Sequence, residues 1–117
     1  MIYIGTSGFQ YDDWVGTYYP EDLPKKDWLT YYAKEFDTLE INFTYYRMPN
    51  AKTLFLMAQK VPEHFLFTIK ATQEMTHARE RDAQVFKQFT EAIAPLREAN
   101  KFGCILAQGE RCFDFTL

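Results

Sequence analysis

Hydrophobic residues along this chain recur with two periods, one typical of strands and one typical of helices, and the two kinds of segment alternate. Short apolar runs with a period of two predict strands over residues 2–7, 38–44, 65–71 and 102–108. Longer segments with apolar residues three and four apart predict helices over residues 25–36, 51–61 and 82–94. Each expected strand is therefore followed by a helix until the last one.

Each expected helix has one apolar face and a recognisable boundary. The three faces consist of Trp28, Leu29, Tyr32, Ala33 and Phe36; of Leu54, Phe55, Ala58 and Val61; and of Val85, Phe86, Phe89 and Ile93. Asn50 is a good N-cap for the second helix, because its side chain can accept hydrogen bonds from the first free N–H groups. Pro62 stops that helix, and Pro95 is expected to end or kink the third.

The alternation predicts an α/β fold with a parallel sheet, since only crossovers of this length can join parallel strands. Two closures fit the pattern: an open doubly wound sheet, or a piece of a (β/α)₈ barrel, whose full length is about 250 residues. The glycine-rich dinucleotide fingerprint is missing after the first strand, because the run Gly5-Thr6-Ser7-Gly8 lacks the third glycine.

The polar residues of the expected strands gather at one end of each strand. Within residues 38–44, Leu39, Ile41 and Phe43 would point one way, and Glu40, Asn42 and Thr44 the other. Burying an unpaired carboxylate costs roughly several kcal/mol. Glu40 and Asn42 therefore line a hydrated cavity or belong to a satisfied polar network.

Composition narrows the class of protein. The 117 residues have room for one domain and are 47% hydrophobic, which is typical of a folded globular chain. The net charge of −3 argues against nonspecific nucleic-acid binding. Cys104 and Cys112 form neither a disulfide framework nor a zinc motif. The sequence shows neither a leader peptide nor a membrane span, so we expect a cytoplasmic location and no membrane partner.

Several motifs in one order resemble the DUF72 (YecE-like) family. They are Ile4-Gly5-Thr6-Ser7-Gly8-Phe9, Trp14-Val15-Gly16, Tyr18-Tyr19-Pro20, Leu23-Pro24, Glu40-Ile41-Asn42-Phe43-Thr44-Tyr45-Tyr46, Phe67-Thr68-Ile69-Lys70-Ala71, Thr76-His77 and Ile105-Leu106-Ala107-Gln108. The resemblance implies a TIM-barrel-like fold, here a half barrel of about four strands and three main helices. It implies no established reaction.

The chain departs from the family pattern in two ways. Family members are about twice as long, so the resemblance covers their N-terminal half. The family also tends to follow its fourth-strand Gln with Pro-Pro and an aromatic residue, where this chain has residues 109–113. We therefore expect a partial barrel domain over residues 1–108 and an atypical tail over 109–117.

In such barrels the active site lies at the carboxyl ends of the strands. Glu40 and Lys70 would then be either a general acid or base with an adjacent ammonium, or a structural ion pair that plugs the barrel mouth. His77, in the loop after the third strand, is a candidate second proton carrier. Asn42 is expected to orient substrate or to hold a loop. Gln108 ends the fourth strand and is expected to bind substrate.

The turn after the first strand and the aromatic residues near the strand ends are candidate binding groups. Thr6 and Ser7 could offer hydroxyls and backbone N–H groups to an anion or a sugar. Ser7 is not expected to act as a nucleophile, because the elbow motif is incomplete. Trp14, Tyr45 and Tyr46 could stack on a sugar or a base, or could roof the barrel.

The sequence does not identify a cofactor. Glu40 and His77 could supply two metal ligands, but the known spacings provide no third, so no metal site is predicted. The functions left open are a barrel enzyme acting on a polar small molecule or nucleic acid, a noncatalytic module binding carbohydrate, phosphate or single-stranded nucleic acid, and an inactive truncated fragment. Because strands one and four would be open edges, we expect a homodimer that closes the barrel.

Overall fold

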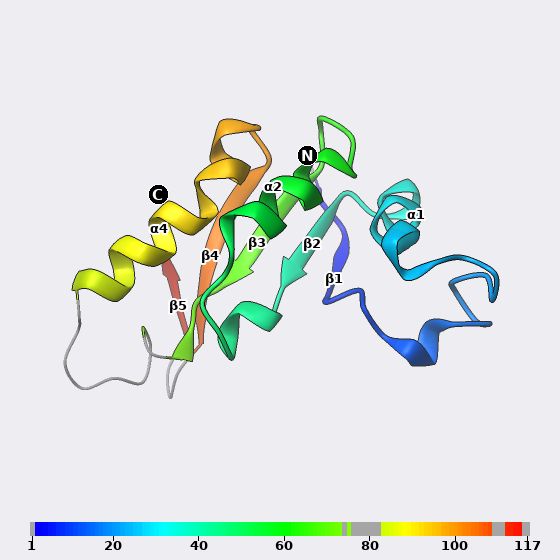
Figure 1. The fold of residues 1–117 in the computed structure, drawn as a ribbon, viewed down its shortest axis with the longest axis horizontal. Helices are drawn as coiled ribbons and strands as arrows, with labels where there is room; N and C mark the ends of the chain where they lie inside the picture. The colour runs from blue at the N-terminus through cyan, green and yellow to red at the C-terminus, as the bar shows by residue number, and fades with distance from the viewer. Residues whose placement is uncertain (1, 74, 76–82, 109–111, 116–117) are drawn as a thin grey trace.

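The computed structural model describes residues 2–73, 75, 83–108 and 112–115 (Figure 1). The strands are β1 (Gly5–Ser7), β2 (Thr38–Ile41), β3 (Leu66–Lys70), β4 (Phe102–Gln108) and β5 (Cys112–Phe115). The helices are α1 (Trp28–Glu35), α2 (Ala51–Gln59) and α4 (Ala83–Glu98). Three short 3₁₀ turns are η1 (Asp12–Trp14), η2 (Lys25–Asp27) and η3 (Phe43–Tyr45).

Strands β1 to β4 pair in sequence order and run parallel, and β5 pairs antiparallel with β4. Helices α1 and α2 form the first two crossovers, and α4 lies in the third. Figure 1 shows these helices ranged along the sheet. Four consecutive parallel strands with three helices confirm the predicted α/β architecture and form half of a TIM-barrel-like arrangement.

The core lies between the helices and one face of the sheet. Side chains of β2 and β3 alternate between buried and half-buried positions, as the period of two predicted. The buried strand residues are Leu39, Ile41, Phe67 and Ile69, and they share one cluster with Leu29, Leu54, Phe89 and Ile93 of the helices. The opposite face carries the half-buried side chains of β2 and β3, and none of the helix residues of the core cluster pack with these side chains in that cluster, so we call it the uncovered face.

The sequence pattern predicted the N-cap of α2 and the bounds of β4 correctly but misplaced one side chain of α2. The Asn50 side chain accepts hydrogen bonds from the backbone N–H groups of Lys52 and Thr53, at 2.9 and 3.2 Å. The prediction that Phe55 points inward is wrong, since 49% of that residue is exposed. Met57 is buried instead, because it lies three residues after Leu54 and thus on the same side of the helix.

Two strands are shorter than the sequence pattern predicted. β1 begins at Gly5, and Ile2 before it is 82% exposed, because the first strand has a neighbour on one side only. β2 ends at Ile41, because the backbone of Asn42 turns to ψ −15° and η3 follows. Thr44 is fully buried, and its hydroxyl donates to the Lys70 carbonyl rather than extending a strand face.

Two expectations about the second half of the chain also need correction. Pro95 lies inside α4, which continues to Glu98, because Leu96 on the last turn is fully buried and holds that turn against the core. The edge of β4 is not open, since β5 pairs with it. The unpaired edges of the described sheet are therefore those of β1 and β5.

One buried hydroxyl joins α1 to the first two strands. The hydroxyl of Tyr32, a fully buried residue, donates to the Thr38 carbonyl at 2.9 Å. It also accepts the backbone N–H of Thr6 at 2.8 Å. These two backbone groups are 32 residues apart along the chain and are satisfied by the same side chain, which sets the position of the helix over the sheet.

The Tyr18 hydroxyl is a contrasting case. Its oxygen is buried and has no hydrogen-bond partner among the described residues. Burial raises the pKa of Tyr18 to about 12, with the negative charge of Glu35 as the next cause. This hydroxyl therefore loses its contact with water without gaining a partner.

We expect Tyr32→Phe to lower the free energy of unfolding by about 1–3 kcal/mol, because it leaves backbone groups of Thr6 and Thr38 without their partner. Tyr18→Phe makes the same chemical change but removes an unpaired hydroxyl, so it is expected to be neutral or stabilising. Urea denaturation of both variants measures the difference. Equal losses in the two variants would contradict the role given to Tyr32.

Candidate functional site

The uncovered face of the sheet brings the predicted polar residues of different strands into rows. Ser7 is paired in register with Glu40, Glu40 with Thr68, and Thr68 with Cys104. Lys70, two residues after Thr68 and nearer the carboxyl end of β3, is paired with Leu106. Residues two apart on a strand share a face, so Lys70 lies on the same side as Thr68 and Glu40.

A small cavity opens where β1 and β2 end. Its volume is about 210 Å³, and its walls come from residues 8–11 and 40–43. The first segment is the turn after β1, and the second is the end of β2 with the start of η3. The cavity thus lies at the carboxyl ends of parallel strands, the position that such folds use for ligands.

Two polar side chains of this cavity, those of Asn42 and Tyr11, meet beside Ser7. The amide nitrogen of Asn42 lies 3.4 Å from the Ser7 hydroxyl and 3.4 Å from the Tyr11 hydroxyl. The Tyr11 hydroxyl donates to the Ser7 carbonyl at 2.5 Å. Asn42 therefore contacts the turn after β1, which is one of the two roles expected for it, and its long contacts leave the amide accessible to a ligand.

Glu40 stands at the cavity without a side-chain partner among the described residues. The residue is half-buried and lines the cavity. Its backbone carbonyl accepts the Gly8 N–H at 2.9 Å, but its side chain makes no hydrogen bond or ion pair with any residue that the structure describes. The carboxylate is thus held at the cavity by the strand and not by a partner.

Lys70 does not neutralise Glu40. No ion pair within 4.0 Å joins these two described residues. The structural ion pair, one of the two alternatives that the sequence left open, is therefore absent between them. The Lys70 ammonium instead lies 4.9 Å from the centre of the Tyr45 ring. One negative and one positive side chain are therefore presented on the same face without cancelling one another.

Thr6 lies on the other face of β1. It is paired in register with the buried Leu39, and its hydroxyl lies 2.7 Å from the Gly8 carbonyl and 3.0 Å from the Tyr32 hydroxyl. The N–H groups of Thr6 and Gly8 bond to Tyr32 and to Glu40. These groups are occupied within the fold, so they are not available to an anion as the sequence suggested.

The predicted aromatic residues occupy different places. The centre of the Trp14 ring lies 5.0 Å from that of the Tyr11 ring and 5.7 Å from that of the Tyr19 ring. Trp14 is therefore part of the aromatic cluster of the first loop. Tyr45 is half-buried, and Tyr46 is 78% exposed with its ring 5.1 Å from that of Tyr45. Tyr46 is the one of the three that leaves a ring open to solvent.

Two predicted site residues lie wholly or partly outside the described part. His77 is outside the described residues, and Gln108 is described only by its backbone position at the end of β4. Within the described ranges, no group of three His, Cys, Asp or Glu side chains is arranged to hold a metal ion.

The sequence reasoning did not assign Gln10 or the Tyr11 hydroxyl to the site. Both line the cavity, because Gly8 has a φ of 80° and turns the chain after β1 back toward β2. A glycine directly after a strand is the signal that could have indicated this return. A Cβ at Gly8 would overlap the Tyr11 hydroxyl and come within 2.9 Å of the Asn42 amide nitrogen.

We expect Gly8→Ala to lower the free energy of unfolding more than Gly16→Ala does. Both glycines have positive φ, so both substitutions incur a strain of about 1–2 kcal/mol. A Cβ at Gly16 would have its nearest contact at 3.4 Å, whereas at Gly8 it overlaps the end of the exposed Tyr11 side chain, which must move and give up its hydrogen bond to the Ser7 carbonyl, adding about 0.5–1.5 kcal/mol. Urea denaturation of the two variants isolates this second cost, and identical losses would show that the turn is not tightly packed.

No helix in the described part of the chain is long and apolar enough to cross a membrane.

Comparison with known proteins connects these features to one family. Residues 3–117 match the family model described as protein of unknown function DUF72. The UPF0759 protein YunF of Bacillus subtilis (strain 168) is 29% identical over 120 residues, which cover 97% of this chain and 42% of YunF. The chain therefore spans less than half the length of this relative.

Solved structures show the same relation. A crystal structure of a DUF72 family protein from Thermotoga maritima MSB8 has a TM-score of 0.75 and 34% identity, covering 90% of this chain and 43% of that one. A DUF72 family protein from Enterococcus faecalis V583 has a TM-score of 0.59 and 24% identity, covering 66% of this chain and 33% of that one. The second likeness is one of fold.

Proposed function

This chain belongs to the DUF72 family of unknown function, as its motifs predicted, and from that premise we propose that it carries an acid/base pocket of a barrel enzyme. The pocket is the cavity at the carboxyl ends of β1 and β2, and Glu40 is its proton carrier. The volume of about 210 Å³ favours a polar small molecule over a polymer as the substrate.

The unpartnered carboxylate of Glu40 is the observation that carries this proposal. The Glu40 oxygens are not among the buried side-chain atoms that lack a partner, so water in the cavity can hydrate the carboxylate until a ligand displaces it. The carboxylate has no hydrogen bond or ion pair with the described residues and faces a cavity. A carboxylate without a protein partner is free to accept a proton from a bound ligand.

The neighbouring groups supply the rest of the chemistry. The Asn42 amide and the Tyr11 hydroxyl would hydrogen-bond the polar groups of the substrate and orient it toward Glu40. Lys70, whose charge Glu40 does not cancel, would stabilise negative charge that develops on the substrate. His77 and Gln108 keep their expected roles as second proton carrier and substrate ligand.

A noncatalytic pocket for a carbohydrate is a second candidate, and the exposed ring of Tyr46 beside Tyr45 favours it. Aromatic faces of this kind stack on sugar rings. The two candidates differ in what Glu40 does, since a binding module has no turnover to lose.

We expect Glu40→Gln to lower turnover by about 10²- to 10⁴-fold while leaving the free energy of unfolding within about 0.5 kcal/mol. The amide keeps the shape of the side chain but cannot exchange the proton, and no described partner of the carboxylate is lost. The measurement is a panel of chromogenic esters, glycosides and phosphates, followed by urea denaturation. Glu63→Gln, an exposed residue outside the cavity, is the matched control.

Loss of folding in Glu40→Gln would mean that the carboxylate is structural, and full activity in it would refute the acid/base role. Binding of a sugar that survives in Glu40→Gln but is lost in Tyr46→Ala, with no turnover in either protein, would select the noncatalytic pocket.

We also propose that a second copy of the chain covers the uncovered face of the sheet. That face presents Glu40, Thr68 and Lys70, and the adjoining edge strand begins beside the exposed Ile2 and Ile4. Two such sheets face to face would supply eight parallel strands, the strand number of a TIM barrel, with contact between the copies at the unpaired edges of β1 because β5 occupies the edge of β4. An unpaired edge with exposed apolar residues is also a ready template for association.

We expect sedimentation equilibrium to give a mass of about twice the chain mass of 13.9 kDa. Ile4→Lys should shift the equilibrium toward monomer, because it puts a charge at the edge of β1, whereas Lys34→Gln on the exposed surface of α1 should not. A folded monomer at all concentrations would count against the second copy.

A further inference from the structure

A larger cavity lies on the helical side of the molecule, next to the sheet-end cavity, which is the one at the carboxyl ends of β1 and β2. It is a groove of about 680 Å³. One wall consists of η2 and the start of α1, the other wall is α2, and η3 lies at one end. This volume is within the range of about 300–1,000 Å³ that is typical of small-molecule sites. Phe9, Gln10 and Phe43 line both this groove and the sheet-end cavity, so the two are adjacent.

The groove is strongly cationic. Lys25, Lys26, Arg47 and Lys60 line it, and no carboxylate is found among the described residues of its wall. The whole chain has a net charge of −3, so four positive charges around one hollow are a local concentration and not an average property. Like charges gathered in this way repel one another unless an anion lies between them.

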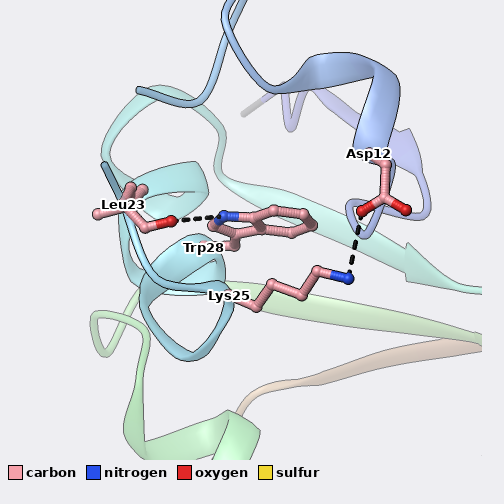
Figure 2. Close-up of polar contacts among 4 residues, drawn as sticks. All are labelled: Asp12, Leu23, Lys25 and Trp28. Carbon is pink, nitrogen blue, oxygen red and sulfur yellow. Dashed lines mark hydrogen bonds and ion pairs between the residues drawn. The ribbon is translucent and has the colours of Figure 1, made fainter. Parts of the chain in front are cut away.

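The four cations are not equally available. The Lys25 ammonium lies 3.2 Å from Asp12 and 5.5 Å from the centre of the Trp28 ring, and Figure 2 shows the ion pair with Asp12 as a dashed line. Lys60 donates to the Lys26 carbonyl at 3.1 Å, which orients its ammonium without neutralising it. Arg47 lies 5.8 Å from the centre of the Phe43 ring. About three positive charges therefore remain for a ligand.

The floor of the groove is apolar. Leu29 and Met57 are buried at 2% and 7% exposure, and Phe43 and Met48 are half-buried beside them. A bare inorganic anion would leave this surface uncovered, whereas an organic body attached to the anion would cover it. The groove thus pairs a charged rim with an apolar base.

The α2 N-terminus does not account for this anion preference. Its first free N–H groups, those of Lys52 and Thr53, already bond to the Asn50 side chain. Side-chain cations must therefore provide the attraction, and the planar guanidinium of Arg47 is suited to two oxygens of a phosphate.

We propose that this groove binds a small organic phosphate, with the phosphate between Arg47, Lys26 and Lys60 and the organic body on the apolar floor. This inference does not rest on the acid/base role of Glu40. Adenosine monophosphate is a suitable probe because it carries a phosphate and an apolar-faced ring system.

The test is a chemical-shift titration of the ¹⁵N-labelled chain with adenosine monophosphate, adenosine and inorganic phosphate in parallel. We expect the monophosphate to shift the amides around Lys26, Arg47 and Leu56, and to bind at least about tenfold more tightly than either fragment. Added salt should weaken its binding, because the contact is electrostatic. Equal affinity for all three probes, or no shifts in the groove at millimolar ligand, would overturn the proposal.

Charge-removing variants give the sharper comparison. Lys26→Gln and Arg47→Gln are each expected to weaken binding of the monophosphate by about tenfold, the usual cost of losing one charge-assisted hydrogen bond. The Lys26 side chain has no partner among the described residues, so its removal is not expected to disturb the fold. Lys34→Gln makes the same charge change outside the groove and should bind as the wild type does.

Several other results would overturn the proposal that the groove binds an organic phosphate. Wild-type affinity in both groove variants, or an equal loss in Lys34→Gln, would refute a built site. Shifts confined to residues 8–11 and 40–43 would move the ligand to the sheet-end cavity and overturn the groove. Tighter binding of a single-stranded oligonucleotide than of the monophosphate would overturn the small-molecule class.

Discussion

Parallel pairing of β1 to β4 is the constraint on which the rest of this structure depends. Parallel neighbours need long crossovers, and α1, α2 and α4 lie in those crossovers against the sheet and bury its apolar side chains. The same pairing brings the carboxyl ends of all four strands to one edge. Polar residues that are far apart in the chain, such as Ser7 and Glu40, therefore meet in one register row.

The Tyr32 hydroxyl shows how closely the layers are joined. It bonds to backbone groups of both β1 and β2, so the helix above the sheet and the ends of the strands are positioned together. Gly8 then turns the chain back over the sheet end, and this turn places Tyr11 against Asn42. The candidate acid/base pocket is thus a consequence of the same packing that holds the fold.

Charge is distributed unevenly over this acidic chain. A carboxylate without a described partner faces the small cavity at the strand ends, and four cations surround the larger groove beside α2. The two hollows share the wall formed by Phe9, Gln10 and Phe43 but present opposite charges. Ligands of different chemistry are accordingly expected in the two places.

The alternation of strands and helices, the inner and outer faces of β2 and β3, the Asn50 cap and the family were all predictable from residue patterns. These features depend on neighbours within a few positions, which periodicity and capping chemistry report directly. The inward position of Phe55 and the end of the third helix at residue 94 were predicted wrongly, because burial against other elements outweighed the local signal.

The partners of individual polar groups were decided by folding. Thr6 and Tyr32 are 26 residues apart and Asn42 and Ser7 are 35 apart, so no local pattern relates them. The separation of Glu40 from Lys70, the turn at Asn42 and the cationic groove likewise depend on how distant elements pack. Sequence periodicity reports which face a residue occupies, whereas the contacts across that face arise from segments that only the three-dimensional arrangement brings together.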